Sequence, residues 1–240
     1  MQSVTLSLYR FSSVSARLWA FAQMATARFA LKAIPEIGFF KLCGSGTGEG
    51  FTPVPNTEVY AILAVWPDHD TARRVFDTAR VFQRYDAKAS EAMTLFLTTQ
   101  TSRGEWAGQT PFTAQGITFN GPIAALTRAT IRPKILLRFW GRVPAISTVI
   151  GQDPNVMFKI GIGELPWLHQ VTFSIWPDTD SMAQFARADG PHAQAIRAVR
   201  DEGWFSEELY ARFRLDGAEG QWAGQTALLQ DIETKDIAAE

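Results

Sequence analysis

Several short segments of this chain occur twice in the same order, and this repetition constrains the fold more than any other feature. The clearest pair is residues 106–110, Trp-Ala-Gly-Gln-Thr, which are identical to residues 222–226. Residues 65–68 also match 175–178, residues 40–42 match 158–160, and residues 17–19 match 138–140. Four matches in one order, at offsets of about 110 to 121 residues, indicate two copies of one folding unit.

Apolar patterns predict the same order of elements in both halves. In the first half we expect strands at 4–9, 37–42, 59–66 and 93–98, with helices from about 13 to 35 and from 68 to about 82. In the second half we expect strands at 126–131, 156–162, 169–176 and 209–215, with helices at 134–149 and 178–200. This βαββαβ order is ferredoxin-like. The predicted α+β fold is therefore a pseudo-dimeric barrel built from two tandem ferredoxin-like repeats.

The repeats also set the predicted boundaries. The first repeat covers residues 1–112, the second covers 121–226, and 227–240 form an acidic tail. A segment at 113–123 that contains glycine and proline joins them. In the first helix, Leu18, Phe21, Ala25 and Phe29 recur on roughly one side, as in an amphipathic helix.

The alternating glycines at 44, 46, 48 and 50 resemble a phosphate-binding loop only in composition. Such loops open a helix, whereas here Pro53, Pro55 and then a strand follow, so we predict a flexible lid or hairpin loop. Cys43 is the only cysteine, and we expect a buried thiol.

Basic residues are segregated although the net charge is −1. Residues 1–35 and 121–152 contain Lys and Arg but no Asp or Glu. This favours either two solvated helix faces or a peripheral contact of 14–34 and 128–142 with anionic lipid. No nucleic-acid motif accompanies these segments. Since no signal peptide or apolar run of ~18 residues is evident, we expect a cytoplasmic protein without a transmembrane helix.

Three histidines are the candidates for metal binding. His69 follows a Trp-Pro-Asp turn and is predicted to be a solvated residue at a helix start, and His169 begins a strand. His192 follows Pro191 near a helix N-terminus, where the helix dipole favours the neutral imidazole that a metal requires. Phe185 and Ile196 fall on the same side of that helix. From the residues alone, a structural role for His192 and a role as ligand both remain open.

No serine-hydrolase order, HExxH, zinc-ligand spacing or EF-hand loop is recognisable. A haem site needs only one histidine and an apolar cavity, so it is compatible with so few ligands.

The segments 173–178, 190–200 and 202–205 resemble the spheroidene monooxygenases of purple photosynthetic bacteria. Residues 18–24, 44–51 and 156–163 are similar to the same family, and the resemblance extends from Val4 to Thr226.

The resemblance implies an oxidoreductase that uses haem, O2 and a donor such as reduced ferredoxin to place a keto group at C-2 of spheroidene, giving spheroidenone. It implies His192 as the axial ligand of the haem iron, with Phe185 and Ile196 beside the cofactor, and a location at the intracytoplasmic membrane. The alternatives are an aldoxime-type haem dehydratase and a haem-free barrel that binds a small molecule.

Overall fold

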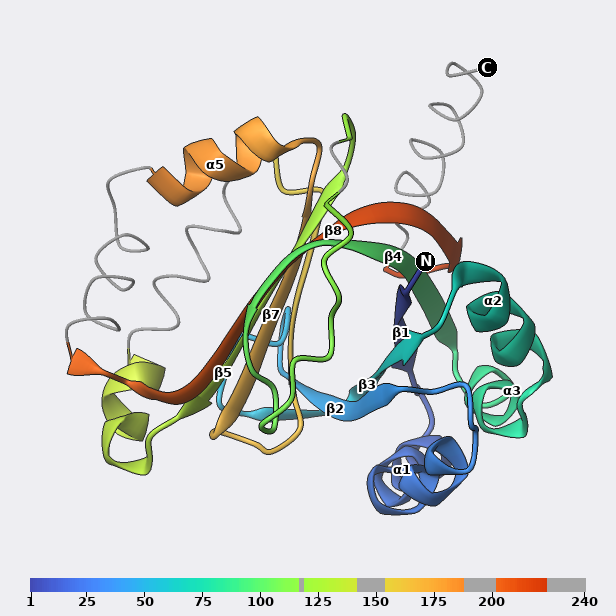
Figure 1. Cartoon of the computed structure of the whole chain (residues 1–240). Coiled ribbons are helices and arrows are strands. Elements are labelled where there is room, and N and C mark those ends of the chain that lie inside the picture. Colours follow the sequence, from blue (N-terminus) through green and yellow to red (C-terminus); the bar gives the residue numbers. More distant parts are fainter. Residues whose placement is uncertain (117–118, 142–153, 188–201, 224–240) are drawn as a thin grey trace.

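The computed structural model describes residues 1–116, 119–141, 154–187 and 202–223. Eight antiparallel strands form one closed barrel, with helices on its outer side (Figure 1). The prediction of an α+β barrel is confirmed. The predicted helical residues 142–149 and 188–200 and the tail at 227–240 lie outside the described residues.

Every predicted strand is present, and six are longer than expected. The strands are β1 (Ser3–Arg10), β2 (Phe39–Gly46), β3 (Pro55–Trp66), β4 (Glu91–Gly104), β5 (Ile123–Ile131), β6 (Phe158–Gly163), β7 (His169–Trp176) and β8 (Phe205–Gly220). The named helices are α1 (Val14–Lys32), α2 (His69–Thr78), α3 (Arg80–Asp86), the 3-10 turn η1 (Pro133–Ile135) and α5 (Thr179–Arg187). Residues 136–141 are also helical.

The strands of the two halves follow the same order around the barrel. The order is β1-β3-β2-β6-β7-β5-β8-β4, so the first half runs β4-β1-β3-β2 and the second runs β8-β5-β7-β6. The repeated tryptophans occupy matching places. Trp66 ends β3 opposite Ser3, and Trp176 ends β7 opposite Ile123, and in each case the partner is the first residue of its strand.

The pairing corrects one of the four sequence matches. Phe39 lies opposite Val65, and Phe158 lies opposite Ile175. Phe39, rather than Phe40, is therefore the counterpart of Phe158. The distinction matters because side chains alternate between the two faces of a strand, so a slip of one residue exchanges the faces. Both Phe39 and Phe158 belong to the barrel interior.

The identical segments 106–110 and 222–226 start at two ends of the barrel interior. Trp106 and Trp222 are both buried in the interior cluster. The alanine that follows each of them has a positive φ, 55° at Ala107 and 51° at Ala223. Residues other than glycine rarely adopt this conformation, so the surrounding contacts must hold it in place.

Helices α1, α2 and α3 cover the outer face of the first half, where large side chains such as Tyr9, Tyr60, Trp66 and Phe96 are buried (Figure 1). Asp68 caps α2, because its Oδ1 accepts a hydrogen bond of 2.7 Å from the backbone N–H of Thr71. The single helix predicted from 68 to about 82 is two helices, because Ala79 has an extended backbone, with ψ of 124°.

The amphipathic pattern of α1 does not place its large side chains in the core. Leu18, Phe21 and Phe29 are 67%, 70% and 79% exposed. The helix packs on the barrel through its other side, whose buried residues are Ala20, Ala27 and Leu31. Small residues allow close approach to the strands, so the larger apolar residues remain on the outside.

The halves join at two seams of very different length. The seam between β4 and β8 extends from the Met93–Gly220 pair to the Gly104–Leu209 pair. The seam between β2 and β6 has only two register pairs, Gly44–Gly163 and Ser45–Ile162. β2 continues through Gly46, so the glycine stretch at 44–50 is a strand end followed by a short loop, not a loop throughout.

That loop closes the short seam. The backbone N–H of Gly161 on β6 donates a hydrogen bond of 2.7 Å to the carbonyl oxygen of Glu49, and the Ser45 hydroxyl donates one of 2.8 Å to the carbonyl oxygen of Gly161. A Cβ on Gly161 would lie 2.5 Å from the carbonyl oxygen of Gly50.

We therefore expect Gly161→Ala to lower the free energy of unfolding by about 1–3 kcal/mol, because the backbones at the seam would have to separate. Urea unfolding measures this. Gly44→Ala is the matched control on the neighbouring strand, since a Cβ there meets nothing within 4 Å. Equal stabilities of the two variants would contradict this account of the seam.

Candidate functional site

A pocket of about 250 Å³ lies where the halves meet, between α1, the loop after β2 and the turn between β6 and β7. Phe21 and Met24 of α1 lie on one side, and Trp140 and Trp167 also line the pocket. Its glycines are Gly44, Gly46, Gly50 and Gly163, and its titratable residues are Tyr60, Glu164 and His169.

Trp167 fastens the rim of this pocket. Its Nε1 donates a hydrogen bond of 2.7 Å to the carbonyl oxygen of Pro53, and its own carbonyl oxygen accepts one of 3.1 Å from Trp140 Nε1. Trp167 has a φ of 67°, in the left-handed region that favours glycine. Backbone strain of this kind costs on the order of 1–3 kcal/mol and tends to occur at functional sites.

Glu164 is the centre of a buried polar network beside the pocket. Its Oε2 accepts a hydrogen bond of 2.8 Å from Trp106 Nε1, and its Oε1 lies 2.9 Å from Lys41 Nζ. Arg128 Nη2 lies 3.8 Å away and His169 Nδ1 lies 3.4 Å away, both measured to Oε2. One carboxylate thus faces two permanent cations and an imidazole.

Arg128 extends this network across the barrel. It is 1% exposed and forms an ion pair with Glu207 on β8. Glu207 in turn accepts hydrogen bonds of 3.0 and 2.7 Å from the backbone N–H groups of Ala107 and Gly108. The placement of Arg128 on a lipid-facing segment 128–142 is therefore wrong, because its charge is paired in the interior.

The network sets the charge state of Glu164. Burial alone would raise the pKa of this carboxyl group, but polar contacts from His169, Lys41 and Trp106 outweigh it and lower the pKa to about 2. Glu164 is thus ionised at every physiological pH. Burial raises the pKa of the Cys43 thiol, which is completely buried as predicted, so the thiol stays protonated.

Two of the three histidines lie among the described residues. His69 begins α2, is half-buried, accepts a hydrogen bond of 2.7 Å from Arg73 Nε and packs against Phe96 at 5.1 Å between ring centroids. It is thus less solvated than expected. His169 begins β7 as predicted, and its side chain is 26% exposed beside the pocket.

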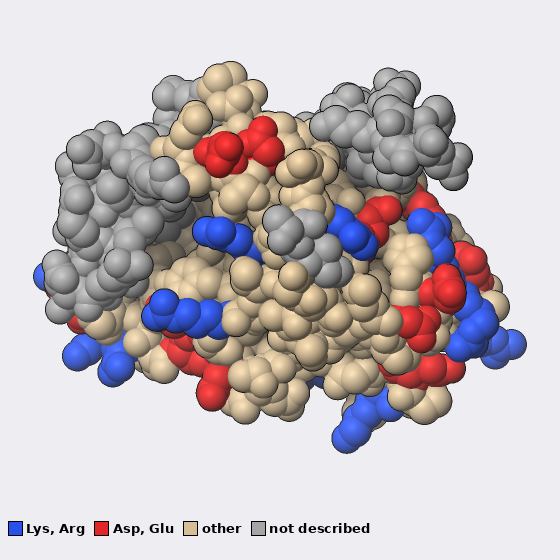
Figure 2. All heavy atoms as spheres, turned by 45° about the horizontal axis from the view of Figure 1, so that its top comes forward, with Lys and Arg blue, Asp and Glu red and all other residues tan. Residues whose placement is uncertain are grey.

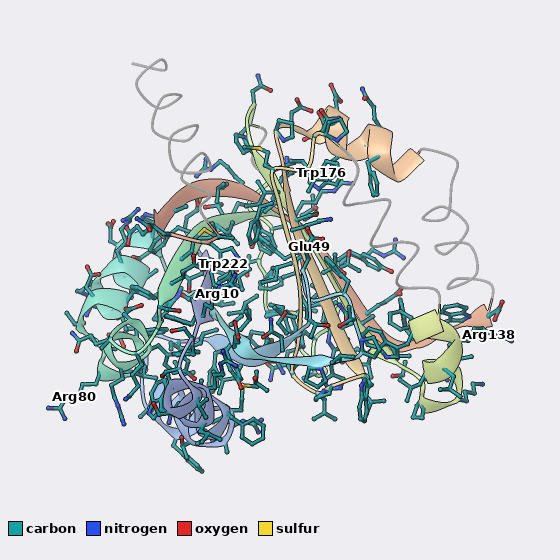
Figure 3. The ribbon with its side chains drawn as sticks, turned by 180° about the vertical axis from the view of Figure 1, so that it is seen from behind. Arg10, Glu49, Arg80, Arg138, Trp176 and Trp222 are labelled. Atoms are coloured by element: carbon teal, nitrogen blue, oxygen red, sulfur yellow. The ribbon has the colours of Figure 1, made fainter. Side chains whose placement is uncertain are left out.

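The predicted ligand His192 and its neighbour Ile196 lie outside the described residues. Phe185 is described on α5, where it is half-buried and packs on Trp176 with 5.1 Å between ring centroids. Figure 3 shows Trp176 at the end of its strand, beneath this helix. α5 begins after Asp178, whose Oδ1 accepts a hydrogen bond of 2.7 Å from Ser181 N.

The outer faces of the two half-sheets differ sharply at matching positions. The strand pairing makes Tyr9, Tyr60, Ile62, Leu42 and Phe96 of the first half equivalent to Ala129, Gln170, Thr172, Gly161 and Arg212 of the second. The first set packs against helices, whereas the second is small or polar. Among the described residues, the outer face of the second half therefore carries smaller or more polar side chains than the outer face of the first.

The network of Glu164 and Arg128 has no local signature in the sequence. Lys41, Trp106, Arg128, Glu164 and Glu207 come from five distant segments, and only the closed barrel brings them together. A weak signal existed in Arg128, since a lone arginine at an inward position of an apolar strand requires a buried partner.

Comparison with known proteins identifies the family. A protein of Rhodobacter capsulatus named spheroidene monooxygenase is 49% identical over 241 residues, which covers 99% of this chain and 100% of the relative. The chain belongs to the spheroidene monooxygenase family. A relative of the same name from Cereibacter sphaeroides is 50% identical, with 94% of this chain and 70% of the relative covered. A third, from Rubrivivax gelatinosus, is 31% identical over 88% of this chain and 81% of the relative.

Solved structures support the barrel. An aldoxime dehydratase superposes with a TM-score of 0.59 at 9% identity, covering 89% of this chain and 81% of that chain. A second, in complex with butyraldoxime, gives 0.61 at 10% identity, with 89% and 79% covered. No family model matches the sequence. Among the described residues, no helix is long and apolar enough to cross a membrane, and no group of three or more His, Cys, Asp or Glu is placed to hold a metal.

The lowered pKa of Glu164 predicts a pH dependence of stability. Its carboxylate stabilises the native state fully above its ordinary pKa of 4.5, and this contribution is lost as the pH falls toward about 2. We expect Glu164→Gln to unfold more easily at pH 7, by on the order of 2–3 kcal/mol, because Lys41 and Arg128 lose their partner. The difference from wild type should shrink between pH 4.5 and pH 2.

Urea unfolding at a series of pH values measures this difference. The exposed Glu105 provides the control, since Glu105→Gln should stay within ~0.5 kcal/mol of wild type. A difference between wild type and Glu164→Gln that is constant from pH 7 to pH 2 would rule out the ionised carboxylate as its cause.

Proposed function

We propose that this chain is a haem-dependent monooxygenase that introduces a keto group at C-2 of spheroidene and related acyclic carotenoids. The observation that supports the activity and the substrate is the 49% identity, over 99% of the chain, to a relative named spheroidene monooxygenase. O2 and a reduced ferredoxin-like donor are the co-reactants of the proposal.

The reaction consists of two hydroxylations at one methylene. Each inserts one oxygen atom from O2 into a C–H bond and reduces the other atom to water with two electrons and two protons. The second hydroxylation gives a gem-diol, which loses water to form the ketone. The methylene is allylic, so its C–H bond is weakened. Bound haem would supply the activation of O2.

The small side chains on the described outer face of the second half support a flat cofactor there. Ala125, Thr127 and Thr172 are half-buried side chains of small size on that face. Arg212, which replaces an aromatic residue of the first half, would provide a cation for the carboxylates of haem. We place the iron ligand at His192, whose segment follows α5, with Phe185 and Ile196 beside the ring.

The protein's own contributions are binding, orientation and exclusion of water. A helix N-terminus at His192 would keep the imidazole neutral and able to bind iron. Apolar walls around the cofactor and the polyene would hold one methylene close to it, and positioning of this kind supplies a large part of the rate enhancement of an enzyme.

The two halves are, in this proposal, tandem ferredoxin-like repeats with boundaries at 1–112 and 121–226. Matching strand orders and the matching positions of Trp66 and Trp176 support it. We also propose a cytoplasmic location with peripheral contact to the intracytoplasmic membrane, where the carotenoid resides, and no nucleic-acid partner.

Replacement of His192 tests the cofactor site. The protein is expressed with haem supplied, and the absorption spectrum and the O2-dependent formation of ketone are measured. We expect His192→Ala to lose or strongly shift the Soret band and to abolish ketone formation, because the iron loses its axial ligand. The fold, followed by circular dichroism, should persist.

His69→Ala is the matched control, because His69 contacts Arg73 and Phe96 at the other half of the barrel. It should leave the spectrum and the activity nearly unchanged. A normal spectrum in His192→Ala with a lost spectrum in His169→Ala would move the iron to β7. Dehydration of an aldoxime without ketone formation would support a dehydratase instead, and absence of a Soret band in wild type would support a haem-free binder.

A further inference from the structure

The outward side of α1 is an apolar surface. Val14, Leu18, Phe21 and Phe29 are between 67% and 79% exposed. Their spacings of four, three and eight residues place them on one side of the helix. A row of large apolar side chains facing water is unfavourable and marks a surface that contacts another apolar phase.

The charges on α1 indicate what that phase is. The helix contains Arg17, Arg28 and Lys32 and no Asp or Glu from Val14 to Lys32. Arg17 is paired with Glu58, while Arg28 and Lys32 are exposed. By contrast, basic and acidic atoms are interspersed on the side of the molecule that carries α2 and α3 (Figure 2). Apolar residues flanked by cations match the boundary of an anionic bilayer.

The apolar surface continues to the mouth of the pocket. Phe21 belongs to both, and Met24 lies in the pocket wall one helical turn further. On the opposite side of the mouth, Leu165 and Trp167 are 48% and 55% exposed and also line the pocket. Val54, 58% exposed, follows Pro53, which accepts the hydrogen bond from Trp167.

The pocket suits a section of a long flat hydrocarbon. Its walls bear the aromatic rings of Phe21, Trp140 and Trp167, and glycines lie on the β2 and β6 strands beside them. Polar groups, Glu164 and His169 among them, line the rest of the pocket. At about 250 Å³ it is smaller than the ~300–1,000 Å³ of common small-molecule sites, so a molecule of forty carbons cannot be enclosed in it. Only one part of such a chain can enter while the rest remains in the lipid.

We propose that the side of α1 formed by Val14, Leu18, Phe21 and Phe29 docks on an anionic bilayer and that the adjoining pocket takes one section of a polyene directly from the lipid. The proposal depends on the proposed function only for the identity of the polyene as a carotenoid. It assigns to the pocket a binding role that is separate from the cofactor site.

The docking step is tested by co-sedimentation with vesicles of phosphatidylcholine containing phosphatidylglycerol. Leu18→Ser combined with Phe29→Ser removes apolar area without touching the pocket, and we expect vesicle binding to weaken at least tenfold. The control is Leu18→Met with Phe29→Leu, which keeps the side apolar and should bind as wild type does. Binding of wild type should also weaken with salt.

The pocket is tested by binding of spheroidene from detergent micelles, followed as carotenoid that co-elutes with the protein. Gly44 lines the pocket, and a Cβ there meets nothing within 4 Å, so Gly44→Leu fills the pocket from its wall. We expect this variant to lose at least tenfold in polyene binding and to keep vesicle binding. Gly44→Ala serves as the control, and the double serine variant should bind polyene from micelles as wild type does.

Three results would overturn the proposal: vesicle binding by the double serine variant equal to that of wild type, polyene binding by Gly44→Leu equal to that of wild type, or equally strong wild-type binding to neutral vesicles in high salt. If the double serine variant kept vesicle binding but were no longer reduced by ferredoxin, the side of α1 would be a protein-docking surface instead. Absence of ketone formation with both binding results as expected would refute the proposed function and leave the binding assignment standing.

Discussion

One closed antiparallel sheet holds both halves together, and its alternation of side chains divides the structure into a shared inside and two separate outsides. Inward positions of both halves meet in a single core, so Leu6, Leu63, Phe173 and Phe213 are buried together. Outward positions of the first half pack mainly on its own helices, although Arg73 of α2 also forms an ion pair with Glu219 of β8. The inner face therefore restrains both halves equally, whereas each outer face is free to change alone.

The outer faces of the two halves carry different side chains at matching positions. Matching positions that hold Tyr9, Tyr60 and Phe96 in the first half hold Ala129, Gln170 and Arg212 in the second. Filled by rings, the first outer face is a packing surface for α1, α2 and α3. The described part of the second outer face carries small or polar side chains at these positions instead of rings.

The sequence predicted the elements well because strands buried on one or both faces have strong patterns of period two or continuous apolar runs. The sequence-based prediction failed where a periodic pattern does not show which side of an element faces the core. The apolar side of α1 was visible in the sequence, but nothing local indicates whether that side faces the strands or solvent. Ala20 and Ala27 lie against the strands because small residues allow close approach. Phe39 and Phe40 are adjacent, so the pattern alone could not decide which one faces inward.

The polar network lay beyond local reasoning for a different reason. Glu164 and Arg128 acquire their partners only when distant strands close into the barrel. Charged side chains in the interior need partners there, because an unpaired buried charge is destabilising. Arg10 is only half-buried and is paired with Glu91, and its guanidinium carbon lies 4.9 Å from the centroid of the Trp222 ring (Figure 3).

The two seams between the halves differ in the number of backbone hydrogen bonds that hold them together. The long ladder between β4 and β8 is the stronger seam, because separation of these strands would break many backbone hydrogen bonds at once. The two register pairs between β2 and β6 are the weakest link in the ring. Gly44 and Gly163, which form one of these two pairs, also lie in the pocket wall. The two strands that the fewest backbone pairs hold together are thus the strands beside which a chain wider than the pocket would enter.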